Sequence, residues 1–530
     1  MKKTIVCLIA ITLLLSVFLT SCGFLGKTPE KESETKSEVL DGSEVEENSN
    51  KNETESKDSE VVEDSDKNET ESETLEAEGD SDKNELGFGK QNYDNKDFQV
   101  LLNNIYPIFE RDFYVSELNG NNLNRVIYAR NTACEEYLGI KLQYILEPGD
   151  WKSGISAKVA NQVLGGGCEY DMLAIAVNAG LNGGNIGIYQ NIMEMEYIDF
   201  DHSWWIQDMI DQNSINGQLY FLAGDTCMTT YSSMGCVFAN LGVADRYKID
   251  VDFYELVNSG NWTVEQLFTL FRKVKDDSNG DGVIDPLTET YGWCDHGVGT
   301  RLMWSSCDIS MLERQSDDTF ILRDSLDDRI ISFVEDMKEA CDDELSYHTE
   351  KDAEMADAFA SDRVLFATTQ LARIEDIKGR DINSSFAILP LPKYDEQQSD
   401  YISTAMANHN ALFFPATISS PELSSQVAEF MGYYGQTKII PEYYDTNLKY
   451  KQNDDTANIA MLDLIRDKLR VTPNETYGAV AGGKSVMTMT QTTATNTADD
   501  GFYSNPVSKW EENVSALSDE IKAYIFKYYQ

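Results

Sequence analysis

Positive charge is scarce in this chain. Its 530 residues include 43 Lys and Arg against 91 Asp and Glu, so the formal net charge is −48. Such a chain repels phosphate backbones and anionic lipid, and no basic patch interrupts the acidic background. The composition therefore argues against nucleic acid as a partner and against electrostatic attachment to a membrane surface.

Residue types that mark metal and catalytic sites are few or scattered. None of the four histidines stands in a His-Glu-x-x-His arrangement, and neither a hydrolase nucleophile elbow nor a Cys-x-x-Cys pair is present. Beyond Cys7 and Cys22, seven cysteines remain without regular spacing, which argues against a disulfide framework. Most are expected to be buried and to pack as small hydrophobic residues. A Cys227–Cys236 disulfide is kept as an alternative.

The N-terminus has the pattern of an export signal. Two lysines at positions 2 and 3 precede an apolar run that ends at Leu19-Thr20-Ser21-Cys22. The run is too short for a comfortable membrane span. The last four residues resemble the bacterial lipobox, which implies cleavage of residues 1–21, lipidation of Cys22, and a chain anchored on the extracytoplasmic face of the cell membrane. An uncleaved helix, or secretion with an incidental cysteine, is the alternative.

Residues 22–93 are predicted to form a disordered acidic tether. Between Lys27 and Lys90 there are 23 acidic and 8 basic side chains, and no aromatic residue precedes Phe88. A segment of this composition cannot bury enough apolar surface to offset the entropy of ordering. A Ser-(Asn/Asp)-Lys-Asn-Glu unit recurs at 49–53, 65–69 and 81–85 without apolar residues to stack, as in a duplicated linker.

Residues 94–530 are predicted to form an α/β body. Phe98–Leu102, Lys141–Ile145 and Asp171–Val177 have the pattern of strands, and Leu123–Leu138 has helical spacing. Such alternation predicts mainly parallel sheets. Asn216-Gly217 indicates a turn, and Thr263 with Gln266 forms a capping box that opens a helix to about Lys275.

Taken in order, several segments resemble the extracellular solute-binding proteins of bacterial ABC importers, in particular the carbohydrate-type (family 1) lipoproteins. The matching segments are Val100, Asn131–Ile140, Asp171–Val177, Ser203–Trp205, Ile215–Asp225, Gly260–Leu267, Asp276–Asp285, Tyr291-Gly292, Phe386–Tyr394 and Tyr401–Ser403. Each segment alone is a weak match, and the resemblance depends on their occurring in the same order. It implies two α/β lobes that are joined by hinge segments and close on a ligand.

The resemblance also implies approximate lobe boundaries. Lobe one would comprise residues 98–225 and 400–445, and lobe two would comprise 226–399 and 446–530. The crossings between them would lie near Ala223–Ser232 and between Pro390 and Ala405. These boundaries are approximate by ten residues or more.

One loop matches the calcium-binding pattern through its ninth position. The expected ligands are the side chains of Asp277, Asn279, Asp281 and Asp285 and the carbonyl of Val283. The twelfth position holds Thr288 instead of a bidentate glutamate, and Glu289 comes one residue late. A structural calcium ion is therefore weighed against a metal-free polar turn, and no other cofactor is required.

Candidate ligand contacts come from two arguments. Sugar rings stack on aromatic faces, which selects Tyr106, Trp204, Trp293, Trp304 and Tyr401, although core packing is the commoner role of a tryptophan. Trp262 is assigned to packing outright. By position, the resemblance implies contacts from loops after strands and from the first crossing. Those places hold Asn178, Asp225, Trp293, Asp295, Gln370 and Arg373.

Together these features predict a non-enzymatic, monomeric, lipid-anchored protein that captures a small solute, most simply an oligosaccharide, for ABC permease subunits. An extracellular carbohydrate-cleaving enzyme is the first alternative, because 91 acidic residues supply carboxylate pairs everywhere. The binding module of a surface sensor is the second. Ligand identity is not determined by these patterns, since related binders of sugars, peptides and polyols share one architecture.

Overall fold

The computed structural model describes residues 85–103, 107–115, 121–148, 154–181, 186–296, 298–349, 351–444, 456–478 and 505–528. The predicted signal peptide, Cys22 and most of the predicted tether lie outside them. The tether prediction is wrong at its end, because Leu86 and Phe88 are buried and the Tyr137 hydroxyl donates to the Phe88 carbonyl. These two apolar side chains supply the buried surface that the preceding acidic stretch lacks.

The first sheet, with its helices, is called lobe one. Its strand order is β12-β3-β1-β2, where β1 pairs in parallel with β2 and β3, and β12 is antiparallel to β3. Its strands are β1 Lys96–Asn103, β2 Ile140–Glu147, β3 Met172–Ala176 and β12 Asn410–Phe413. Its helices are α3 Pro107–Arg111, α4 Asn122–Leu138, α5 Gly154–Leu164, α6 Val177–Leu181, α7 Gln207–Asn213, α16 Pro421–Tyr434 and α17 Ile440–Tyr443.

The second sheet, with its helices, is called lobe two. Its order is β10-β4-β9-β5-β8, with parallel pairs between β9, β5 and β8 and antiparallel pairs at β4 and β10. Its strands are β4 Gly235–Asn240, β5 Tyr291–His296, β8 Ser346–Thr349, β9 Val364–Gln370 and β10 Phe386–Pro390. Its helices are α9 Leu241–Arg246, α10 Phe253–Asn258, α11 Val264–Phe271, α12 Gly299–Ser306, α13 Asp328–Cys341, α14 Asp352–Ala360, α15 Arg373–Lys378 and α18 Thr456–Asp467.

Local signals explain where several elements begin and end. Asn121 caps α4 through Leu123 N (2.8 Å), and Gly139 ends that helix with a φ of 68°. The predicted cap at Thr263 is confirmed, since its hydroxyl accepts from Gln266 N at 3.2 Å. The helix that it opens ends at Phe271, short of the predicted Lys275, because Lys273 N and Val274 N turn back to carbonyls three residues earlier.

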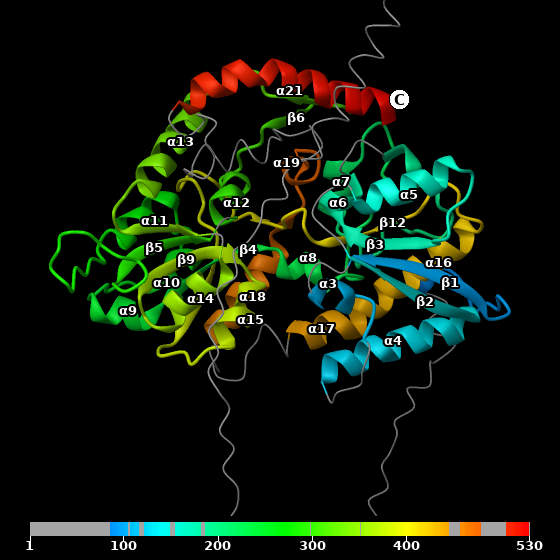
Figure 1. Ribbon diagram of the computed structural model, residues 1–530, viewed down its shortest axis with the longest axis horizontal. Helices are drawn as coiled ribbons and strands as arrows, with labels where there is room; N and C mark the ends of the chain where they lie inside the picture. Colours follow the sequence, from blue (N-terminus) through cyan, green and yellow to red (C-terminus); the bar gives the residue numbers. More distant parts are fainter. Residues whose placement is uncertain are drawn as a thin grey trace, which may run out of the picture. The chain divides into compact units, whose positions relative to one another are not determined.

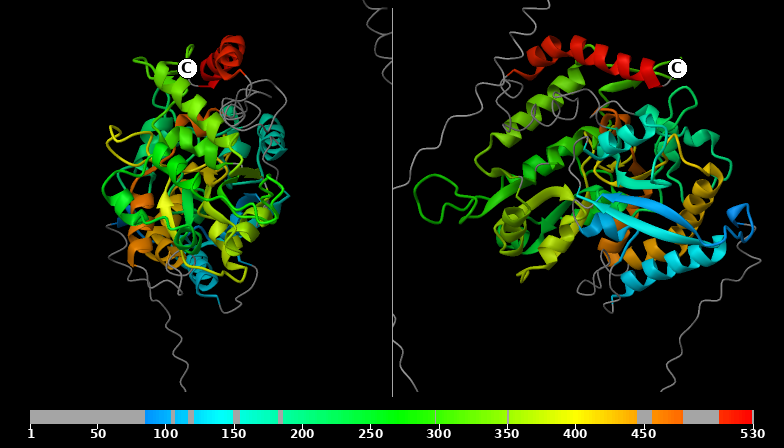
Figure 2. Two further views of the ribbon diagram at one scale, coloured as in Figure 1. Left: turned by 90° about the vertical axis from the view of Figure 1, so that its left-hand side faces the viewer. Right: turned by 45° about the vertical axis from the view of Figure 1, so that its right-hand side comes forward.

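Further strands and helices connect or border the lobes. Figure 1 shows α8 between the two sheets, and Figure 2 shows α4 and α5 on opposite faces of the first sheet. β11 pairs in parallel with β13, and β6 with β7 antiparallel, while α21 packs against β7. These elements are α8 Met228–Ser232, β6 Leu312–Arg314, β7 Phe320–Leu322, β11 Ser403–Thr404, β13 Leu469–Arg470, α19 Pro473–Thr476 and α21 Pro506–Tyr528.

Chain segments distant in sequence meet where the lobes join. Met406 N donates to Ser233 O (3.2 Å), and Ala405 N donates to Arg470 O (3.2 Å), so three passages of the chain lie side by side. α19 contacts α6 and α7, which the predicted boundaries assign to lobe one, although its Glu475 forms an ion pair with Arg301 of α12 in lobe two. The three passages form the junction on which the cavity described next is built.

Candidate functional site

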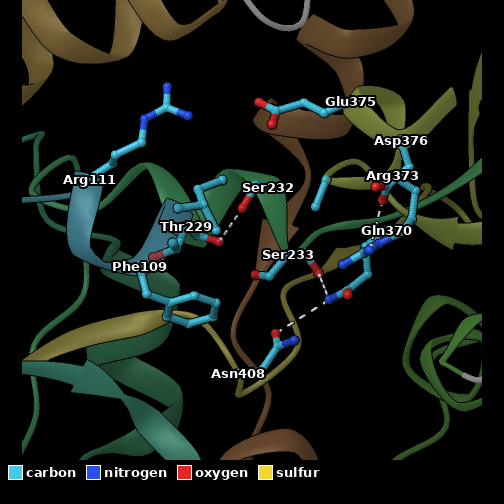
Figure 3. Close-up of a pocket in the computed structure, with 12 residues that line it drawn as sticks. Phe109, Arg111, Thr229, Ser232, Ser233, Gln370, Arg373, Glu375, Asp376 and Asn408 are labelled. Carbon is cyan, nitrogen blue, oxygen red and sulfur yellow. Dashed lines mark hydrogen bonds and ion pairs between the residues drawn. The ribbon is translucent and has the colours of Figure 1, made fainter. Parts of the chain in front are cut away.

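A cavity of about 240 Å³ lies where α3, α8 and α15 face one another. Lobe one contributes α3, which follows β1, and lobe two contributes the end of β9 and the start of α15 (Figure 3). The described residues that line it are Ile108, Phe109, Arg111, Thr229, Ser232, Ser233, Gln370, Ala372, Arg373, Glu375, Asp376 and Asn408. The cavity is therefore bounded by both lobes and by the segments that join them, which is a common place for a ligand site.

A buried carboxylate holds the lobe-one wall in place. Asp112 accepts from Thr229 N (3.2 Å), from Thr229 Oγ1 (2.5 Å) and from Asn410 Nδ2 (2.9 Å). Asn410 Nδ2 also donates to the Phe109 carbonyl at 2.9 Å. Burial raises the pKa of Asp112 to about 6, against the hydrogen bonds that lower it. This network ties α3 to the first crossing and to β12.

An amide pair forms the floor between the lobes. Gln370 Nε2 donates to the Ser233 carbonyl (3.0 Å) and points to Asn408 Oδ1 at 3.4 Å (Figure 3). A carbonyl accepts only from a donor, so the Ser233 contact fixes which end of the Gln370 amide is NH₂. Gln370 Oε1 and Asn408 Nδ2 are thereby left as one acceptor and one donor without a hydrogen bond to another described residue.

Two carboxylates hold the lobe-two wall. Arg373 Nη1 lies 2.5 Å from Asp352 Oδ2 and 2.8 Å from Asp376 Oδ2. Asp352 Oδ1 in turn lies 2.9 Å from His296 Nε2, at the end of β5. The contact with His296 and the charge of Arg373 lower the pKa of Asp352. The Arg373 side chain is thus fixed before any ligand is present.

No protein-family model and no curated protein matches the sequence. Solved structures do match. A cyclo/maltodextrin-binding protein complexed with maltotetraose matches 81% of this chain and 97% of its own, with a TM-score of 0.51 and 12% identity. The galacto-N-biose-/lacto-N-biose I-binding protein of the ABC transporter from Bifidobacterium longum, in complex with lacto-N-biose, matches 83% of this chain and 99% of its own, with a TM-score of 0.51 and 10% identity.

The chain has their fold. The two-lobe α/β architecture of the periplasmic-binding-protein type, predicted from the order of short segments, is confirmed. At 10% and 12% identity the likeness concerns the fold, and the site must be argued from its own residues. Within the described ranges, no helix is long and apolar enough to span a bilayer.

Gln370 and Arg373 are the two predicted contact residues that line the cavity. Asn178 lies in α6, two residues past the end of β3, and its backbone N–H donates to Ala407 O (2.9 Å). Its Oδ1 is buried with no partner among the described residues, yet Asn178 is not among those lining the cavity. Tyr106 lies outside the described residues.

Asp225 and Asp295 instead brace the backbone next to the cavity. Asp225 is buried, burial raises its pKa, and it accepts the Tyr231 hydroxyl of α8. Gly435 packs so closely there that a Cβ would meet the Asp225 carbonyl. Asp295 accepts from Thr300 N at the start of α12 (2.8 Å) and lies 3.0 Å from His348 Nδ1. Burial favours neutral Asp295, but these contacts outweigh it, and its pKa is lowered.

The predicted aromatic candidates are packed in the protein interior. Trp293 is fully buried against Phe268 and Phe271, and its Nε1 donates to Thr368. Trp204 donates to the buried Glu429 carboxylate at 2.9 Å. Trp304 packs on Phe333, and the Tyr401 hydroxyl donates to the Val257 carbonyl. None of these four is among the described residues that line the cavity, and a stacking role for them stays a prediction.

The calcium-like loop is closed by its own hydrogen bonds. Asp277 accepts from Gly280, Asp281 and Gly282 N, and Glu289 accepts from Asn279 and Asp285 N at 3.1 and 3.0 Å. These backbone donors lower the pKa of Glu289. The described residues contain no group of three or more His, Cys, Asp or Glu placed to hold a metal ion. Calcium binding by Asp277, Asn279, Asp281, Val283 and Asp285 stays a prediction.

Sequence reasoning missed Phe109, Arg111, Ser232 and Asn408. Phe109 and Arg111 lie in the helix after β1, a few residues beyond Tyr106, so the rule that loops after strands carry contacts would have reached them. Ser232 ends the predicted first crossing. Asn408 lies just past the predicted second crossing. The seven cysteines among the described residues are unpaired, and five of them are buried.

Proposed function

We propose that this chain is a lipid-anchored solute-binding protein that captures an extracellular saccharide, without converting it, and delivers it to ABC permease subunits. One observation carries the proposal: a cavity lies at the junction of two lobes and takes residues from both. A ligand that contacts both walls stabilises the closed arrangement of the lobes. The shared fold supports this mechanism, and the sugar-binding proteins that have it support a saccharide.

The floor of the cavity fits sugar hydroxyls. Gln370 Oε1 and Asn408 Nδ2 offer an acceptor beside a donor, and neighbouring hydroxyls of a sugar ring both donate and accept. Phe109, whose ring lines the cavity, offers an apolar face for the C–H side of the ring (Figure 3). Among the described lining residues, one aromatic ring and a polar floor thus support the binding of a sugar ring.

Calorimetry with the purified full-length chain tests this function. We expect stoichiometric binding of one saccharide class, and a melting temperature raised by the ligand, because a ligand at about 100 times its Kd adds roughly 2.7 kcal/mol to stability. Chromatography of the same mixture should show the saccharide unchanged. Released products would favour the carbohydrate-cleaving enzyme, and binding that never supports uptake by cells would favour a sensor module.

The lipid anchor is tested separately. Cells that express the chain are grown with labelled palmitate, and we expect label on the wild-type protein but not on the Cys22→Ser variant. The variant should also appear in the soluble fraction. Equal labelling of both proteins would contradict lipidation at Cys22 and would leave the binding function untouched.

A further inference from the structure

The cavity contains a cation that has no counter-ion among the described residues. Arg111 lines it from α3, and no hydrogen bond or ion pair joins the Arg111 guanidinium to another described residue. In Figure 3 the acidic lining residues, Glu375 and Asp376, lie on the opposite wall. In a chain with 91 acidic and 43 basic residues, an arginine left without a carboxylate stands out.

Arg373, on the opposite wall, differs from Arg111. Its Nη1 is shared by Asp352 and Asp376, so its charge is already compensated within the protein. Asp376 is likewise engaged. Arg111 is therefore the one lining cation, among the described residues, whose charge is available to a ligand.

Neutral saccharides suit this cavity poorly. Closure around a neutral ring would remove water from the Arg111 guanidinium without supplying an anion, which weakens binding. Phe109, the single aromatic among the described lining residues, gives less stacking surface than a neutral oligosaccharide commonly requires. The volume of about 240 Å³ lies below the usual range of about 300–1,000 Å³, so it suits one or two sugar units.

We propose that the cavity binds a saccharide bearing a carboxylate, of the uronic acid class, with the carboxylate held by Arg111. This rests on the proposed function and specifies its ligand. The planar guanidinium matches a carboxylate in a paired, charge-assisted contact. In Figure 3 Arg111 points away from Phe109, Gln370 and Asn408, so the acidic sugar unit lies at Arg111. A linked sugar unit lies over Phe109 with its hydroxyls at Gln370 and Asn408, and Glu375 repels the acid from the lobe-two side. The ligand is thereby oriented with its acid toward α3.

Calorimetry with matched ligand pairs tests the proposal on the full-length chain. The pairs are galacturonic acid with galactose, glucuronic acid with glucose, and uronate-terminated disaccharides with their neutral parents. We expect an acid to bind at least about tenfold more tightly than its parent, and Arg111→Gln to remove about 10- to 100-fold of that affinity. Arg111→Lys keeps the positive charge but loses the planar guanidinium that contacts a carboxylate through two N–H groups. Its affinity for the acid should fall less than that of Arg111→Gln.

Arg125→Gln is the matched control, because Arg125 is exposed on α4 of the same lobe and contacts only Asn122 among the described residues. It should bind as the wild type does. Unliganded Arg111→Gln should melt at the wild-type temperature, since no described residue depends on its guanidinium. Raising the salt concentration should weaken binding of the acid and leave any binding of the neutral sugar unchanged.

The outcomes separate the two proposals. Equal or tighter binding of the neutral parents, or unchanged acid binding by Arg111→Gln, would overturn the uronic acid assignment and keep the saccharide function. Binding of no saccharide, or tighter binding of a dipeptide or citrate included as non-sugar carboxylates, would overturn the proposed function as well.

Discussion

The two walls of the cavity are held in different ways. On the lobe-two wall the side chain itself is fixed, since Arg373 contacts Asp352 and Asp376. On the lobe-one wall the backbone is fixed through Asp112 and Asn410, while the side chain of Arg111 has no ion pair with a described residue. An arginine fixed by ion pairs is already oriented when a ligand arrives, whereas an arginine without an ion pair keeps an uncompensated charge that a ligand can neutralise. The cavity thus combines a preformed wall with a wall that the ligand completes.

The largest effect is expected from breaking the lobe-one anchor. Asp112→Ala leaves Thr229 N, Thr229 Oγ1 and Asn410 Nδ2 as buried donors without their acceptor. We expect the free energy of unfolding to fall by about 3 kcal/mol, measured by urea denaturation. Asp97→Ala is the control and should cost about 0.5 kcal/mol or less, because Asp97 is exposed and, among the described residues, accepts a hydrogen bond only from Gln143. A loss below about 1 kcal/mol for Asp112→Ala would show that water replaces the lost carboxylate.

The same anchor predicts two opposed effects of pH. Burial raises the pKa of Asp112 from 3.8 to about 6 and lowers the pKa of His409 from 6.5 to about 4. As pH rises from about 4 to 6, the free energy of unfolding loses about 2 kcal/mol through Asp112 and gains a similar amount through His409. The native state binds the extra proton in the first case, and the unfolded state does so in the second.

Single variants should separate these contributions. The free energy of unfolding should be measured by urea denaturation across that pH window. Relative to the wild type, it should fall with rising pH in His409→Gln and rise with rising pH in Asp112→Asn. If both variants have the same pH dependence as the wild type and differ from it only by a constant free energy, the pH dependence does not come from Asp112 and His409.

A smaller effect is expected on the lobe-two wall. Asp352→Asn keeps the shape of the side chain but removes the charge that fixes Arg373 Nη1. Because Asp352 is partly exposed and Asp376 remains, we expect a three- to tenfold loss of ligand affinity by calorimetry, about 1 kcal/mol. Asp357→Asn, on the same helix and paired with Arg380, should leave affinity unchanged. Equal losses in both variants would trace the effect to α14 as a whole.

The smallest effect on the cavity should come from calcium. If the loop at 277–285 binds calcium with a Kd near 0.1 mM, then 1 mM calcium adds about 1.4 kcal/mol to stability and changes ligand affinity by less than about twofold. Asp281→Asn should abolish that gain in melting temperature. Identical melting curves with calcium and with chelator would establish the loop as a metal-free turn closed by Glu289.

Local sequence patterns predicted many of the helices and strands. The buried run at Met172–Ala176, the helix at Asn122–Leu138 and the cap at Thr263 depend on periodicity and on contacts within a few residues, so they are legible in the sequence. The turn predicted at Asn216-Gly217 is confirmed, with φ of 51° and 68°, and the residues after it form isolated bridges such as Leu222 with Leu412. That pairing depends on a partner far along the chain.

The sequence by itself determined the acidic balance, the lipobox-like motif, the α/β class and the positions of Gln370 and Arg373 after a strand. Only the tertiary structure decided which side chains share a cavity. The sequence around Trp293 and Trp304 does not distinguish them from aromatic residues that line a cleft. In the structure Trp293 packs on Phe268 and Phe271, Trp304 packs on Phe333, and both are buried. Asp112 meets Asn410 across almost three hundred residues, and no carboxylate of the described residues is placed to pair with Arg111. Such relations depend on long-range packing, which no local spacing encodes.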